Sequence, residues 1–141
     1  MYFRSRLKTW DVVAWNSAAD EIFAFSRVAG ADRNTLISVL TNPAGRRLFG
    51  SSWAIQAQRM VAQFRATHDL WAGDPAFADL LERLRQGCPE FAGWWEAHDI
   101  RDVSAGQKSL RHPKKGALRF EDTTFRANDD PALKLVIYTA A

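Results

Sequence analysis

The chain has very little cysteine, few glycines and prolines, and no long apolar run. Of its 141 residues one is cysteine, Cys88, so the chain cannot close a disulfide within itself, and a reducing compartment is expected. No apolar run approaches the roughly 20 residues that span a bilayer, and the N-terminal residues lack the apolar core of a signal peptide. We therefore expect a soluble cytoplasmic protein without a membrane partner.

The sequence patterns of common active sites are also missing. The three histidines, His68, His98 and His112, do not have the spacing of a metal motif. There is no glycine-rich phosphate loop and no serine nucleophile elbow, and Cys88 precedes Pro89 as a helix-boundary residue would. These absences predict a protein that is not an enzyme and holds no metal and no cofactor.

Aromatic residues, by contrast, are abundant. Six tryptophans and nine phenylalanines indicate a bulky aromatic core, an aromatic cavity, or both. The 47% hydrophobic and 25% charged residues are ordinary for a globular protein, and the length predicts one domain over residues 1–141. The net charge of +3 is too small to argue for nucleic-acid binding.

The N-terminal residues have the period-two pattern of strands. Trp10–Trp15 alternates and then reaches Asn16, a preferred helix cap, so a strand is expected to lead directly into a helix. Tyr2–Arg6 is expected to pair with it as a hairpin. Strict alternation would place Val12 and Trp15 on opposite faces, with Trp15 on the face that reaches a pocket.

The middle of the chain has helical periodicity, and its caps and prolines divide it into segments. The expected helices are Ser17–Phe25, a short helix capped by Asp32 or Asn34 that carries Leu36 to Leu40, Ala44–Phe49 after Asn42-Pro43, one long helix from Trp53 to Trp71, Pro75–Gly87, and a shorter helix from Pro89 to near His98.

Beyond Ile100 the period returns to two. The expected strands are Ile100–Val103, Lys108–His112, Leu118–Phe125 and Leu133–Thr139. The last of these is the most hydrophobic and should be central. Strands at both ends of the chain with helices between them predict an α+β fold, an antiparallel sheet of about five strands with helices packed on one face.

Two features are candidates for ligand binding. Lys108–Arg119 contains no acidic residue, and Arg111 and His112 within it could bind a carboxylate or phosphate, although a solvated hairpin explains its lysines more simply. Aromatic residues could line a cavity, but helical periodicity alone favours core packing for them. This aromatic set is Trp15, Phe23, Phe49, Trp53, Phe64, Trp71, Trp94 and Trp95.

Five ordered blocks of sequence resemble a known family. They are Trp10–Ala19, Asn42–Phe49, Pro89–Phe91 with Trp94 or Trp95, Leu110–Pro113 followed by Gly116, and Leu135–Thr139. In this order and spacing they resemble the ligand-binding domain of the MmyB-like transcription regulators, from about Tyr2 to the end of the chain.

The resemblance implies a PAS-like fold and a sensor that binds a fatty-acid-like small molecule. Members of the family carry a repressor-type helix-turn-helix domain ahead of this one. That domain is missing from the present sequence, so DNA would be a partner only through absent residues. PAS-like domains commonly associate, so a homodimer is possible.

The leading hypothesis is a non-enzymatic sensor that binds an elongated apolar ligand between sheet and helices. Arg111 and His112 are predicted to meet its head group. The alternative is a dimerisation or protein-interaction module with a filled core and no ligand, and an interior cavity would discriminate between the two. The residues predicted to contact the apolar tail are Trp15, Phe23, Leu40, Trp53, Met60 and Phe64.

Overall fold

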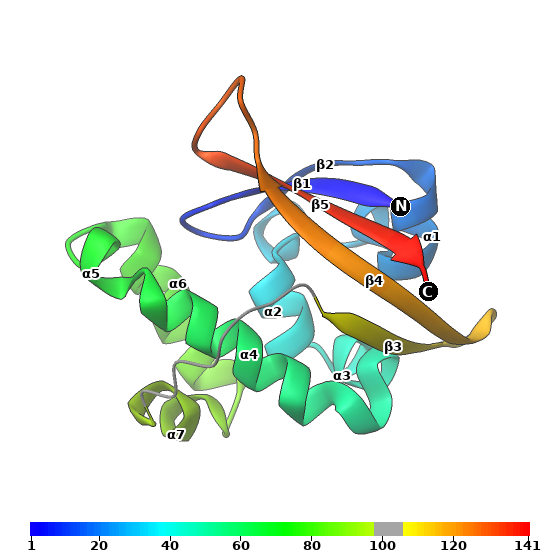
Figure 1. Ribbon diagram of the computed structural model, residues 1–141. Coiled ribbons are helices and arrows are strands. Elements are labelled where there is room, and N and C mark those ends of the chain that lie inside the picture. The colour runs from blue at the N-terminus through cyan, green and yellow to red at the C-terminus, as the bar shows by residue number, and fades with distance from the viewer. Residues whose placement is uncertain (98–105) are drawn as a thin grey trace.

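The computed structural model describes residues 1–97 and 106–141. Its strands form one antiparallel sheet in the order β2-β1-β5-β4-β3, so the last strand is central, as predicted (Figure 1). The predicted strand Ile100–Val103 lies outside the described residues. The strands are β1 (Tyr2–Arg6), β2 (Val12–Trp15), β3 (Gln107–His112), β4 (Gly116–Arg126) and β5 (Leu133–Ala140).

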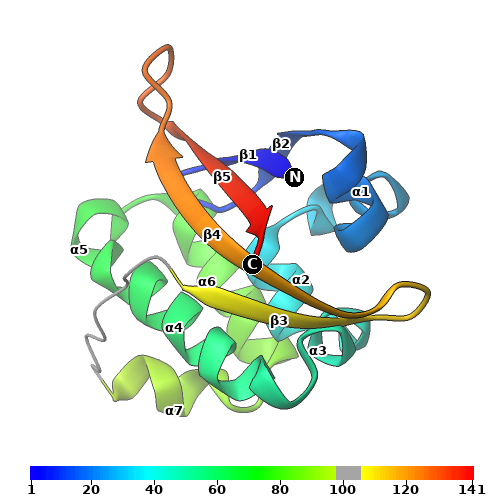
Figure 2. The ribbon, with the colours of Figure 1, turned by 45° about the vertical axis from the view of Figure 1, so that its right-hand side comes forward.

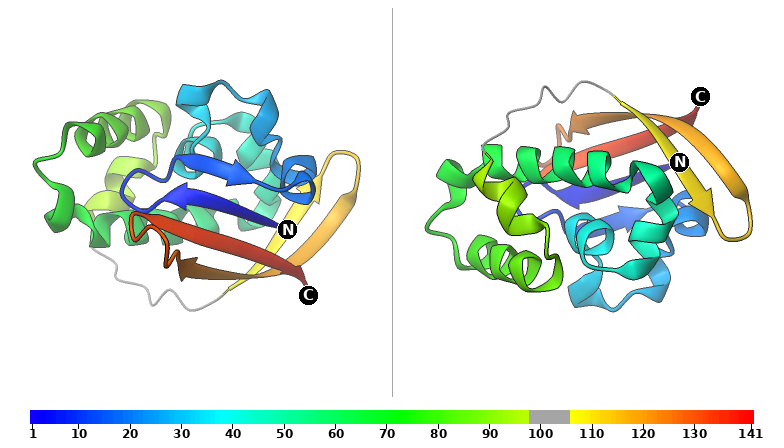
Figure 3. Two further views of the ribbon diagram at one scale, coloured as in Figure 1. Left: turned by 90° about the horizontal axis from the view of Figure 1, so that it is seen from above. Right: turned by 90° about the horizontal axis from the view of Figure 1, so that it is seen from below.

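The sheet curves over the helices, which lie on one of its faces (Figures 2 and 3). Helices α6 and α7 pack on α2 and α4 rather than on the sheet. This arrangement confirms the predicted α+β fold. The helices are α1 (Ser17–Phe23), α2 (Thr35–Leu40), α3 (Pro43–Phe49), α4 (Trp53–Ala66), α5 (His68–Trp71), α6 (Pro75–Gly87) and α7 (Phe91–Glu96), with 3-10 turns η1 (Phe25–Arg27), η2 (Gly30–Asp32) and η3 (Gly50–Ser52).

The predicted caps form, but two helices end earlier than expected. Asn16 caps α1 by accepting a hydrogen bond from the Ala19 amide at 3.0 Å. The first helix stops before Ala24, whose φ of 55° is left-handed. The predicted helix from Trp53 to Trp71 divides at Thr67, because the Thr67 hydroxyl and amide both donate to the Phe64 carbonyl, at 2.9 and 3.2 Å. That bonding closes the last turn of α4.

Strand β2 departs from the predicted alternation. It begins at Val12 because Trp10 has a φ of 65°, outside the strand region. A bulge lies between the pairs Arg4–Ala14 and Ser5–Val12. Val12 and Trp15 therefore pair with Ser5 and Phe3 respectively, two residues that share the inner face of β1. The prediction that Val12 and Trp15 lie on opposite faces was wrong.

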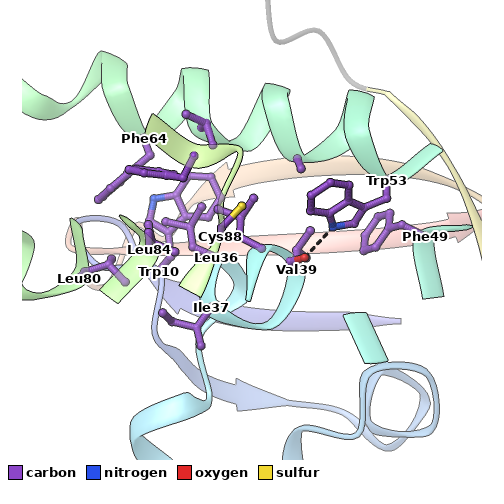
Figure 4. Close-up of a cluster of buried hydrophobic side chains, with 14 of the residues drawn as sticks. Trp10, Leu36, Ile37, Val39, Phe49, Trp53, Phe64, Leu80, Leu84 and Cys88 are labelled. Atoms are coloured by element: carbon purple, nitrogen blue, oxygen red, sulfur yellow. Dashed lines mark hydrogen bonds between the residues drawn. The ribbon is translucent and has the colours of Figure 1, made fainter. Parts of the chain in front are cut away.

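Buried apolar residues gather in two clusters, the helical core and the sheet cluster. In the helical core the Trp53 Nε1–H donates to the Val39 carbonyl at 2.7 Å (Figure 4). The helical core is Trp10, Ile22, Leu36, Ile37, Val39, Leu40, Leu48, Phe49, Trp53, Ala57, Val61, Phe64, Phe77, Leu80, Leu84, Cys88, Phe91, Trp95 and Leu110. The sheet cluster is Phe3, Val12, Ala19, Phe25, Val136 and Tyr138. Among the described residues no helix is long and apolar enough to cross a bilayer.

Candidate ligand-binding cavity

A cavity of about 1430 Å³ lies between the inner face of the sheet and the helices. It exceeds the roughly 300–1,000 Å³ of most small-molecule sites. On the helical side of the cavity, α3 packs closely on α2 at Gly45, because a Cβ at this position would collide with the Ser38 carbonyl of α2. The sheet cluster forms one wall with Phe3, Phe25, Val136 and Tyr138, and the helices form the other with Val39, Leu48, Phe49, Met60 and Trp71.

Among the described residues, the cavity has more cationic than acidic side chains. Its three acids are engaged: Asp20 accepts from the Ser26 amide and hydroxyl, Glu21 pairs with Lys115 at 2.9 Å, and Asp122 pairs with Lys108 at 3.0 Å. The surplus positive charge favours an anionic ligand. The eight cations are Arg27, Arg47, Lys108, Arg111, Lys114, Lys115, Arg126 and Lys134.

Residues 7–141 match the family model of the MmyB-like transcription regulator ligand binding domain. The chain belongs to this family. No curated protein matches it.

An MmyB-like ligand-binding domain is a sensory part of a transcription regulator, and the family is not one of enzymes. The large cavity between the sheet and the helices of this MmyB-like domain has room for a small molecule.

Lys134 lies on the cavity wall in the central strand β5. Its Nζ stands 3.6 Å from the centre of the Trp10 indole ring, and no hydrogen bond or ion pair reaches it from the described residues. Burial lowers the pKa of this ammonium group to about 8. Its cross-strand neighbours are Ser5 on β1 and Arg126 on β4. The Ser5 hydroxyl is fully buried and also lacks a partner among the described atoms.

Trp10 presents its ring to Lys134 from a strained backbone conformation. A positive φ is unusual for a bulky residue and costs about 1–2 kcal/mol. The surrounding backbone is fixed: the Trp10 amide donates to the Arg6 carbonyl at 2.9 Å, and the Asn34 side-chain amide donates to the Thr9 carbonyl at 2.6 Å. These bonds hold the indole, which is 6% exposed, under the Lys134 ammonium group.

The predicted head-group residue His112 is engaged in structural bonds. Its Nε2 lies 2.9 Å from the Glu21 carbonyl and donates to it, because a carbonyl only accepts. Its Nδ1 accepts from the amides of Lys114 and Lys115, both at 3.1 Å. The imidazole thus joins the β3–β4 turn to α1, and both of its nitrogens are used, although the ring lines the cavity.

Arg111, the other predicted head-group residue, also lines the cavity. Its side chain is exposed and lies along Gly50, and within the described part of the chain no acceptor binds its guanidinium. Arg111 is therefore free to meet an anion, but from a solvated position, where a charge pair contributes little.

The six residues predicted to contact the ligand tail lie in different parts of the structure. Phe23 and Met60 line the cavity, whereas Trp15, Leu40, Trp53 and Phe64 do not. Leu40, Trp53 and Phe64 are packed in the helical core. Trp15 packs on Phe25 in the sheet cluster, with ring centres 5.7 Å apart. A role in ligand binding stays a prediction for all six.

Lys134 was not among the binding residues predicted from the sequence, although the composition of its strand indicated an unusual position. It is the one charged residue in Leu133–Ala140, the most apolar strand of the sheet. A charge in a central strand has to be desolvated, so it marks either an ion pair or a binding site. Ser5 had no such signal, because it stands between two arginines in an ordinary strand.

The described residues offer little for catalysis. Burial, and next the Glu90 carboxylate 3.4 Å from its Sγ, raise the pKa of the Cys88 thiol to about 11, so the nucleophilic thiolate is scarce at neutral pH. No group of three metal-ligating side chains occurs within residues 1–97 and 106–141.

Proposed function

We propose that this domain senses a fatty-acid-like molecule, which binds with its apolar chain between the sheet and the helices of a PAS-like fold. The cavity carries the proposal: one wall is the aromatic sheet cluster, the other is the apolar side of α2, α3 and α4, and its ionic lining is mostly cationic. An elongated apolar tail with an acidic head matches both properties.

Burial of an alkyl chain would supply the affinity. Each methylene removed from water contributes about 0.8 kcal/mol, so roughly ten methylenes give about 8 kcal/mol before the costs of association. Phe3, Phe23 and Tyr138 form an aromatic surface for such a chain, with ring centres 5.6–6.1 Å apart. These rings already pack on one another, so the free domain keeps this surface formed.

The alternative is a dimerisation or protein-interaction module with a filled core. Filled cores are closely packed and leave few voids, whereas a cavity of about 1430 Å³ lies on the inner face of this sheet. The cavity therefore supports the sensor over the alternative.

Signalling would be a shift between two arrangements of sheet and helices. A ligand in this cavity would contact both the sheet and the helices. Within the protein, the two layers contact each other where α3 packs on β3 and where His112 forms a hydrogen bond with the Glu21 carbonyl of α1. A ligand that binds one arrangement more tightly raises its population. In a regulator that shift would pass to the DNA-binding part.

Native mass spectrometry and thermal unfolding test this function. Protein purified from bacteria should carry an added mass that is released by denaturation. The delipidated protein should be stabilised by dodecanoate, by about 10 °C at a hundredfold excess over its Kd. If no mass is bound and no acid of eight to sixteen carbons raises Tm, the sensor proposal fails.

A further inference from the structure

We propose that the ligand is an acid whose carboxylate binds at the ammonium group of Lys134, which lies over the Trp10 indole and opposite Ser5 of β1. This inference rests on the proposed function, because it assigns the charged end of the same ligand. It places the head group on the inner face of the central strand, away from Arg111 and His112 on the edge strand β3.

The first argument is the missing acceptor. Lys134 Nζ and Ser5 Oγ are hydrogen-bond donors on directly opposite residues of β5 and β1, and neither has a partner among the described residues. Of the two, Lys134 lines the cavity and Ser5 is fully buried behind it, so an acceptor that enters from the cavity meets the Lys134 ammonium group. A carboxylate has two oxygens that only accept, so it supplies the acceptor that the Lys134 ammonium group lacks.

The second argument compares Lys134 with the other cations of the cavity. Lys108 and Lys115 already have carboxylate partners. Arg27, Arg47, Arg111, Lys114 and Arg126 are exposed, where water screens their charge. Lys134 is largely buried and unpaired, so a carboxylate would gain most there.

The third argument is that the protein maintains this arrangement at a cost. Trp10 holds a left-handed backbone under Lys134, and the ammonium group is removed from water without an ion pair. Local strain and desolvation of this kind gather at binding sites, where a ligand relieves them. Trp10 acts here as a positioning residue, through the face of its ring.

The sheet then sets the direction of the tail. Successive inner residues of β5 are Lys134, Val136 and Tyr138, about 7 Å apart. From a carboxylate at Lys134, an alkyl chain would run past Val136 towards Tyr138 and Phe23, whose ring centres are 5.6 Å apart. All four residues line the cavity.

Calorimetric titration with dodecanoate and with dodecanol tests the assignment. Lys134→Met should weaken dodecanoate binding about 10- to 100-fold, as expected for loss of a charged hydrogen bond, and change dodecanol binding by less than about threefold. Arg6→Met is the matched control. It removes one exposed cation from the outer face of β1, next to Ser5, and should leave both affinities unchanged.

Two results would overturn the assignment while leaving the sensor function intact. One is Lys134→Met binding dodecanoate as wild type does, in particular if Arg111→Met loses it instead. The other is Arg6→Met weakening dodecanoate as much as Lys134→Met, which would mean that only overall charge matters. Wild-type protein that binds neither molecule would overturn the sensor function itself. Thermal unfolding of each variant confirms that it is folded.

Discussion

The helical core and the sheet cluster are made from the same kinds of residue but are packed differently. In the helical core, aromatic rings fill the space on every side: Phe64 meets Phe77 with ring centres 4.5 Å apart, and both are nearly inaccessible to water. In the sheet cluster, Phe3 and Tyr138 pack on neighbouring rings and also face the cavity. We therefore expect the side chains enclosed within the helical core, such as Phe64, to matter most for stability, and those of the sheet cluster to matter more for binding.

The largest expected effect is in the helical core. Phe64→Ala should lower the free energy of unfolding by about 3–5 kcal/mol, because the lost ring leaves a void that its neighbours cannot fill. Urea unfolding followed by circular dichroism measures the loss. Saturating dodecanoate should raise the stability of the variant only by the increment seen in wild type. A loss below about 1 kcal/mol would mean that this region is not the tightly packed one.

The sequence predicted the fold well because periodicity and caps are local properties. Asn16, Asn34 and Asp74 cap helices where their residue types predict. The errors arose where bonds between elements prevail over local pattern. Trp10 leaves the strand because its backbone bonds to Arg6 and Thr35, which no local pattern reveals.

The candidate site was harder to predict from the sequence. Periodicity identifies which residues are apolar and buried, but it does not show whether a buried ring meets another ring or a cavity. Phe64 and Met60 share one helix and the same predicted stripe, yet Phe64 lies in the helical core and Met60 lines the cavity. The separation depends on how the other elements pack around α4, and that packing is a property of the whole fold.

The next largest effect concerns Lys134 and has the opposite sign. Lys134→Met should stabilise the ligand-free domain by about 2 kcal/mol at pH 7. The pKa of the ammonium group falls from its ordinary 10.5 to about 8, a penalty of about 3 kcal/mol that its contact with Trp10 partly offsets. Below pH 8 the folded and unfolded states are both protonated, and the whole penalty is present.

Between pH 8 and 10.5 the unfolded wild type binds the extra proton, so wild-type stability rises with pH. The advantage of Lys134→Met should therefore shrink over this range, and urea unfolding at pH 7, 9 and 10 measures it. Lys114→Met, at an exposed lysine of the same cavity, should show no such trend. If Lys134→Met were less stable than wild type at pH 7, the buried ammonium group would not destabilise the ligand-free domain.

The smallest change in stability is expected for Phe23→Ala, the cavity-side counterpart of Phe64→Ala. Phe23 is half-buried and already faces open space, so its removal creates little new void and should cost about 1 kcal/mol of unfolding free energy. Its ring should matter more for the ligand, because the proposed tail ends against it and against Tyr138. Dodecanoate affinity should fall several-fold while octanoate affinity, for a chain too short to reach Phe23, stays unchanged. Equal losses for both acids would place the tail elsewhere in the cavity and would remove the direction inferred from β5.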